Sequence, residues 1–208
     1  MSKHLTHDLQ KLQEALLRLA GRVEEAVTKA LEAFVKGRSD LATQVISADV
    51  EVDKEEVEIE EECLKILALH QPVAQDLRRV AACLKIDNDL ERIGDLAVNV
   101  AERALSSNGE GANITPAFRE MIELSMSMLR KSIDAFVRAD AEAARRVLLE
   151  DDRVDADHRT VIQALLARMH EDPSTIDRAL RLISVSKNVE RIADHATNIA
   201  ESVIYDLE

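Results

Sequence analysis

The apolar residues of this chain recur every three or four positions over long stretches, which is the spacing of helices that bury one face. The first stretch is marked by Leu5, Leu9, Leu12, Leu16 and Leu19. No segment sustains the alternation of apolar and polar residues that a half-buried strand requires. The pattern therefore predicts an all-α fold.

Glycine, proline and capping residues mark where the helices begin and end. Gly37 ends the first helix, and Ser39 or Asp40 is placed to cap the second. Pro72 separates the second helix from the third, and Asp140 is placed to cap the fifth. The pattern predicts six helices, over about residues 4–36, 39–70, 73–105, 116–138, 140–170 and 174–205.

One polar stretch occurs twice in the chain. Residues 91–102 and 190–201 are identical at eight of twelve positions, including Glu, Arg, Asp, Asn and a final Glu. Valines and aspartates also match between residues 45–53 and 147–155, so the repeat is wider than this stretch. Two equivalent triplets of helices predict two three-helix bundles of long antiparallel helices, related by a pseudo-twofold axis. The predicted domains are residues 1–105 and 116–208, joined by a linker of turn-forming residues at 106–115.

Acidic side chains are predicted to meet at one height in each half. The middle helix of each triplet carries two aspartates one turn apart, and the last helix carries Glu, Asp and Asn at i, i+4 and i+8. Counting antiparallel about the intervening turn places the two rows level with each other in both halves. The residues are Asp49, Asp53, Glu91, Asp95 and Asn99 in the first half, and Asp151, Asp155, Glu190, Asp194 and Asn198 in the second.

Four carboxylates at one height repel one another, so a metal ion, an arginine or open water must offset the charge. Arg92 and Arg191 lie three residues before Asp95 and Asp194 and can relieve part of it. A row of acids is usually a solvated helix face, but four pairs at matching heights favour a metal site. Oxygen ligands suit Mg, Ca or Mn, and carboxylates on helical bundles also hold iron.

The net charge of −13 limits the class of partner. It repels nucleic acid and anionic lipid, while metal cations and basic protein surfaces are attracted. No apolar run is long enough for a membrane span, and the first residues lack the pattern of a signal peptide. Cys63 and Cys83 lack metal spacing and are predicted to be buried thiols. These features predict a soluble cytoplasmic protein without an integral membrane segment.

No catalytic constellation is visible in the sequence. Glu-x-x-His, the di-iron signature of ferritin-like bundles, does not occur, nor do phosphate-loop or nucleophile-elbow motifs. His195 follows Asp194 directly and is expected on a different helix face. We therefore predict that the protein is not an enzyme.

With these residues in hand, the chain resembles the PhoU family of bacterial phosphate-transport regulators. The resemblance is carried by the run from His70 to Arg78 (HQPVAQDLR), by residues 91–102 and by residues 194–201. The chain departs from the family pattern at Leu96, where a histidine is common, and at residues 171–177, where the fuller Gln-Pro-x-Ala-x-Asp-Leu-Arg is missing. The family pattern assigns the two acidic quartets to two metal sites.

The resemblance implies a negative regulator of phosphate uptake and of the phosphate-starvation response. It implies contact with the ATPase of the phosphate ABC transporter and with a phosphate-sensing histidine kinase, at the inner membrane through these partners. Divalent or trivalent metal ions (Mg, Mn, Fe or Zn) and a homodimer are expected. Three alternatives stay open: a metal-free helical adaptor, an accessory protein of a low-affinity phosphate transporter, and a metal-carboxylate oxidase, which the missing Glu-x-x-His disfavours.

Overall fold

The structure, a computed structural model, describes residues 3–107 and 109–208. Met1, Ser2 and Asn108, which the sequence assigns to the first bundle and to the linker, lie outside the described residues. The described residues contain helices and connecting turns and no strand, which confirms the all-α prediction. No helix among them combines the length and apolar character that crossing a membrane requires.

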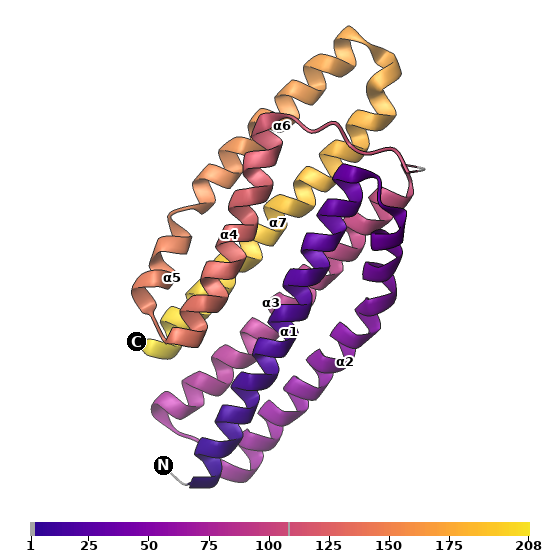
Figure 1. Ribbon diagram of the computed structural model, residues 1–208. Coiled ribbons are helices and arrows are strands. Elements are labelled where there is room, and N and C mark those ends of the chain that lie inside the picture. Colours follow the sequence, from indigo (N-terminus) through magenta and orange to yellow (C-terminus); the bar gives the residue numbers. More distant parts are fainter. Residues whose placement is uncertain (1–2, 108) are drawn as a thin grey trace.

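Two three-helix bundles lie side by side along their length (Figure 1). The second half uses two consecutive helices, followed by a short 3-10 turn, where the first half uses one long middle helix. This arrangement confirms the predicted architecture. The first bundle is formed by α1 (Lys3–Lys36), α2 (Ser39–His70) and α3 (Ala74–Leu105), and the second by α4 (Pro116–Arg138), α5 (Ala141–Leu148), α6 (Asp151–Glu171), η1 (Pro173–Thr175) and α7 (Ile176–Leu207).

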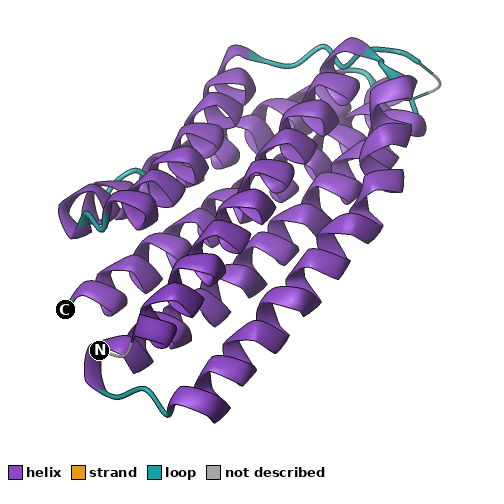
Figure 2. Cartoon of the chain, turned by 60° about the horizontal axis from the view of Figure 1, so that its bottom comes forward, coloured by secondary structure: helices purple, strands orange, loops and turns teal. Residues whose placement is uncertain are grey.

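One apolar core runs through both bundles because α3 and α7 pack against each other. Figure 2 shows the helices of both bundles running roughly parallel to one another. The leucines that defined the first stretch of the sequence are buried on α1, as the spacing predicts. Ile93 on α3 and Ile192 on α7, which match in the repeat, are both fully buried. Cys63 and Cys83 are free and buried, as predicted.

The predicted fifth helix, over residues 140–170, is wrong in one respect: it is broken into α5 and α6 at Leu149 and Glu150. The amide of Glu150 donates to the carbonyl of Val147, three residues back, so the chain tightens into a turn there. Lys131 of α4 holds the Glu150 carboxylate at 2.6 Å. The apolar pattern passes through the break because Val147 and Val154, seven residues apart, both face the core.

The helix caps follow the prediction at α5 but not at α2. Asp140 caps α5 by accepting a hydrogen bond from the amide of Ala143 at 2.9 Å. At α2, however, Arg38 occupies the capping position and makes no side-chain cap. Its guanidinium donates to both oxygens of Asp40, at 2.8 and 2.7 Å. The hydrogen bond from Arg38, with a further contribution from the backbone amides of Leu41 and Asp40, lowers the pKa of Asp40 to about 2.

Gly37 ends α1 as predicted and lies against the linker between the bundles. Its φ of +70° is a left-handed conformation that disfavours any residue with a Cβ. A Cβ added there would also collide with the backbone carbonyl of Gly109. The linker is tied to α1 beside it, since the amide of Ala112 donates to the carbonyl of Phe34 at 3.0 Å.

Gly37→Ala is expected to lower the free energy of unfolding by about 2 kcal/mol or more, because the left-handed conformation alone costs about 1–2 kcal/mol. Gly21→Ala is the matched control, since Gly21 lies inside α1 with nothing within 4 Å of the added Cβ. That change should raise the free energy of unfolding by roughly 0.5–1 kcal/mol. Urea denaturation measures both, and two changes of the same sign would contradict the assignment.

Candidate functional site

The first acidic quartet lies where α2 and α3 pack side by side. Asp49 and Asp53 lie on α2, one turn apart, and Glu91 and Asp95 lie on α3. The absent side chain of Gly94 allows a close approach: a Cβ there would lie 3.9 Å from Oδ1 of Asp49. The predicted level of Asp49, near residue 93, is therefore confirmed to within one residue.

Burial and mutual repulsion act together on this quartet. Partial burial raises the pKa of Asp49, and the charges of Asp53 and Asp95 raise it further. Burial is also the main cause that raises the pKa of Glu91, followed by the charge of Asp95. Both shifts mean that the folded chain resists holding all four carboxylates ionised.

One arginine offsets part of the negative charge of the first quartet. Arg92 lies 3.3 Å from Glu91 and 3.3 Å from Asp95, as the spacing of Arg92 and Asp95 suggested. The guanidinium is half exposed, and the buried Oε2 of Glu91 still has no hydrogen-bond donor. Arg92 therefore offsets part of the charge of this oxygen, and among the described residues no group donates a hydrogen bond to it.

The second quartet repeats this arrangement between α6 and α7. Burial raises the pKa of Asp151, followed by the charges of Asp194 and Asp155. Glu190 is shifted in the same direction by burial and by Asp155, so that its pKa is also raised. Among the described residues Arg191 forms no ion pair, but its charge opposes the rise in the pKa of Glu190 and of Asp194, so it relieves part of the repulsion as predicted.

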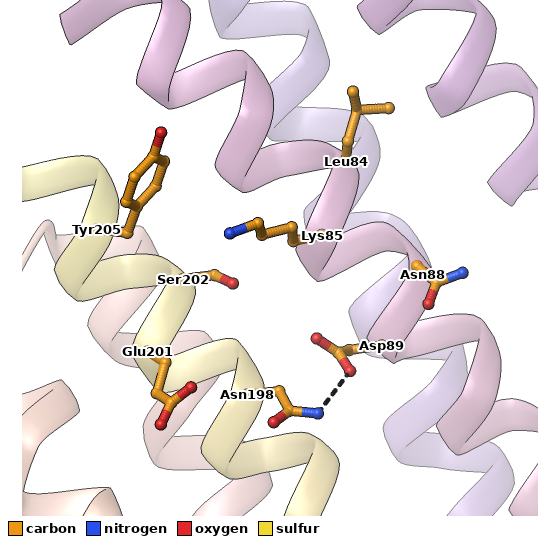
Figure 3. Close-up of a pocket in the computed structure, with 8 residues that line it drawn as sticks. All are labelled: Leu84, Lys85, Asn88, Asp89, Asn198, Glu201, Ser202 and Tyr205. Carbon is orange, nitrogen blue, oxygen red and sulfur yellow. Dashed lines mark hydrogen bonds between the residues drawn. The ribbon is translucent and has the colours of Figure 1, made fainter.

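The two asparagines of the predicted stripes lie in other surroundings. Asn99 is exposed on α3. Asn198 of α7 donates through Nδ2 to Oδ1 of Asp89 on α3 at 3.1 Å, and Nδ1 of His195 reaches the same oxygen at 2.8 Å (Figure 3 draws the first bond). Eight residues turn a helix by a net angle of about 80°, so Asn198 points away from the direction of Glu190.

Asp89 and Asn198 line a cavity of about 600 Å³ between α3 and α7 (Figure 3). Lys85 lies over the ring of Tyr205 at the same cavity, 4.7 Å from its centre. His195 thus points toward α3, on a different face from Asp194, as the sequence predicts. The Asp89 contact itself was not foreseen, because nothing in the helical repeat shows which residues of the two bundles meet.

The fit of a metal ion to the quartets depends on their chemistry. Carboxylates with raised pKa values, together with a buried Glu91 oxygen that accepts no hydrogen bond from the described residues, form an oxygen-rich donor set that suits a hard cation. Among residues 3–107 and 109–208, no three His, Cys, Asp or Glu side chains are already gathered as a ready set of ligands. The donor set therefore fits a metal, and its side chains must turn toward the ion to bind it.

The acidic row of the first half is longer than predicted. Asp87 lies on α3 one turn before Glu91 and is only 2% exposed, and its Oδ1 has no hydrogen-bond partner among the described residues. Burial, followed by the charges of Glu56 and Glu60 on α2, raises its pKa to about 8. Four-residue spacing from Glu91 was the available signal. Comparison of the halves concealed it, because Ser186 occupies the matching position.

At that matching position the second half is neutral. Nδ1 of His158 lies 2.6 Å from Oγ of Ser186. Burial lowers the pKa of His158, which favours the uncharged ring. The two sites are therefore not equivalent: only the first continues as a row of acids one turn beyond its quartet.

Asp87→Asn should remove a pH dependence of stability. Between about pH 4 and about pH 8 the folded chain keeps the Asp87 proton that the unfolded chain releases, so the free energy of unfolding falls as the pH rises through this window. At about pH 9 the variant should be more stable than the parent by about 1–2 kcal/mol, since each pKa unit corresponds to ~1.4 kcal/mol and Glu56 and Glu60 can turn toward solvent. The difference should vanish near pH 4. Urea titrations across this range test it, and parallel curves would contradict it.

The PhoU domain family matches the chain twice, over residues 16–104 and 118–203. A phosphate-specific transport system accessory protein PhoU homolog of Pseudomonas putida is 39% identical over 207 residues, which cover 99% of this chain and 81% of that protein. The homolog of Pseudomonas aeruginosa is 40% identical over 207 residues, with 99% and 86% covered.

Solved structures agree with the sequence relatives. The crystal structure of PhoU from Pseudomonas aeruginosa superimposes with a TM-score of 0.93 at 39% identity, covering 97% of this chain and 98% of that one. The phosphate transport system regulatory protein PhoU from Streptococcus pneumoniae gives a TM-score of 0.89 at 27% identity, with 97% and 96% covered.

Proposed function

This chain belongs to the PhoU family, and from that premise we propose that it is an accessory protein that regulates phosphate uptake by contact rather than by catalysis. The observation that carries the proposal is the double match of the PhoU domain, over residues 16–104 and 118–203. Relatives that cover nearly the whole chain are named as accessory proteins of the phosphate-specific transport system. The match spans both bundles, so the proposed role concerns the entire fold.

The proposed partners are the ATPase subunit of the phosphate ABC transporter and a phosphate-sensing histidine kinase. Rigid bundles suit this role, because long helices with one shared core present fixed surfaces to both partners. The protein would restrain uptake and the starvation response from the cytoplasmic side of the inner membrane. Its location there would come from the partners.

Metal ions at the two quartets are part of the proposal. Asp49, Asp53, Glu91 and Asp95 would hold one site, and Asp151, Asp155, Glu190 and Asp194 the other. An ion bound at either quartet would supply the positive charge that the carboxylates need to stay ionised together. Binding would then fix the relative position of α2 and α3, or of α6 and α7, and so the shape of the contact surface.

Deleting the gene tests the role directly. Cells without it should take up phosphate in excess and express the starvation response when phosphate is plentiful, and the full chain should restore both. The tagged protein should co-purify with the ATPase subunit and the kinase. Unchanged uptake and response in the deletion strain would overturn the proposal. Co-purification with a low-affinity phosphate transporter instead would redirect it to that system.

A further inference from the structure

In the part of the chain that the structure describes, no other element covers the outer face of α2. This helix packs against α1 and α3 at the edge of the molecule, as Figures 1 and 2 both show. Three large apolar side chains nevertheless stand on it: Val50, Val57 and Leu64 are 68%, 49% and 54% exposed. Neighbours in this set are seven residues apart, so each is offset by about 20° from the next, and all three lie within about 40° of one another over about 21 Å of helix. We call them the α2 ridge.

Carboxylates flank the α2 ridge on both sides. Between residues 49 and 62 the chain carries nine Asp or Glu and one Lys. Glu60 lies on the flank that faces α3, and Glu61 lies on the opposite flank. Both are exposed, and among the described residues neither forms an ion pair. This face of α2 therefore combines exposed apolar side chains with carboxylates that form no ion pair.

The second half of the molecule shows that the fold does not require this face. The matching positions, 102 residues later, hold Asp152, Arg159 and Leu166. The matching segment, residues 151–164, carries four acids and two arginines, so its charge is far more balanced. Both halves form the same bundle, yet only the first has a full apolar ridge bordered by acids. Packing within the repeat does not account for the difference.

We propose that the α2 ridge is the docking site for a basic amphipathic helix of a partner protein. Such a helix would lay leucine-like side chains along Val50, Val57 and Leu64 and place lysines or arginines beside Glu60 and Glu61. The inference rests on the proposed function to the extent that regulation works by contact. The surface itself is defined by the exposed residues of α2.

The negative charge around the α2 ridge disfavours the other possible binding partners. A second copy of this chain would bring the same carboxylates face to face around a shared ridge, which is unfavourable. Nucleic acid and anionic lipid carry the same sign of charge as the face. A helix with basic flanks satisfies both the apolar ridge and its border.

The test uses a synthetic helix as the probe. A fluorescent 21-residue peptide with leucine at every a and d position of three heptads and lysine or arginine elsewhere should bind the full chain, as measured by anisotropy. A scrambled peptide of the same composition should bind at least about tenfold more weakly, because it cannot align its leucines. Equal binding of the two peptides would overturn the proposal by reducing the interaction to charge alone.

Two substitutions borrowed from the second half isolate the ridge. Val50→Asp with Val57→Arg installs the residues found at positions 152 and 159 and leaves the net charge unchanged, so attraction by charge persists. This variant should melt like the parent and lose about tenfold or more in affinity for the peptide. Leu166→Asp, in the second half, should bind as the parent does. Unchanged affinity of the double variant would overturn the proposal.

Two further measurements separate the alternatives. Sedimentation of the parent and the double variant should give the same molecular mass, whereas a dimer that dissociates in the variant would mean that a second copy occupies the ridge. In the deletion strain the double variant should fail to restore normal uptake. If it restores uptake as fully as the parent, the docking site is wrong and the regulatory role stands. If the parent also fails to restore normal uptake, the regulatory role is wrong. The peptide-binding measurement then still tests whether the α2 ridge is a docking site.

Discussion

Manganese is expected to stabilise the chelator-treated protein by about 2.7 kcal/mol for each quartet when the free ion is at a hundredfold excess over its dissociation constant. The reason is that the folded chain gathers four carboxylates which the unfolded chain disperses. Thermal melts with added Mn²⁺, Mg²⁺, Zn²⁺ or Fe²⁺, each against a chelator baseline, measure the effect and rank the ions. No shift in melting temperature with any of these ions would contradict the metal proposal.

Replacing two carboxylates of the first quartet by amides should raise the stability of the metal-free protein and reduce the gain in stability that metal provides. Asp49→Asn with Glu91→Gln removes two carboxylates whose pKa values are raised by burial and by neighbouring acids. Without metal, this variant should be more stable than the parent at neutral pH, because the cost of ionising these groups disappears. With metal, it should lose the share of stabilisation that belongs to the first quartet.

The second quartet supplies the matched control for that experiment. Asp151→Asn with Glu190→Gln should remove the other share, and the combined variant should no longer respond to metal. If the combined variant gains as much stability from manganese as the parent does, the ion binds elsewhere. If the neutral variants are less stable without metal, the carboxylates have a structural role that repulsion does not describe.

The helical repeat could be predicted from the sequence because each half buries one face of every helix and repeats its polar positions. Glu91 and Glu190 fall at equivalent places in equivalent helices, so counting residues from the turns was enough to set their heights. The close approach of Asp49 to the Gly94 backbone agrees with that count. The spacing of residues along each helix was therefore enough to predict which acidic residues lie at the same height.

Other features depend on contacts that spacing does not encode. The break at Glu150 follows from a backbone turn that lies beside Lys131 of another helix, and the apolar pattern runs through it unaltered. Asp87 was missed because the comparison of halves retains only what both contain, and Ser186 stands in its place. Asp89 and Asn198 meet because α3 of one bundle packs on α7 of the other, a relation that no repeat within the sequence displays.

Asp89→Ala is expected to destabilise the protein by about 1.5–3 kcal/mol, because it removes a charged acceptor that two side chains of α7 share. The Asp89 carboxylate oxygen accepts from both Nδ1 of His195 and Nδ2 of Asn198, at 2.8 and 3.1 Å. Removing it leaves the half-buried His195 without its acceptor, whereas the exposed amide of Asn198 can bind water in the adjoining cavity, and a hydrogen bond to a charged group contributes about 1.5–3 kcal/mol. Urea denaturation gives the change in the free energy of unfolding.

Two companion variants show whether the shared oxygen is the cause. Asp89→Asn keeps an acceptor oxygen of the same reach and should lose only about half as much, since a hydrogen bond to a neutral group is weaker than one to a carboxylate. Asn88→Ala, at the exposed neighbouring position, should change stability by less than about 0.5 kcal/mol. Because Asp89 joins one bundle to the other, its loss should also make amide exchange faster in α3 and α7 than in α2 and α6. Uniform exchange across all four helices, or equal losses for the alanine and asparagine variants, would mean that the two bundles are held together by their apolar contact alone.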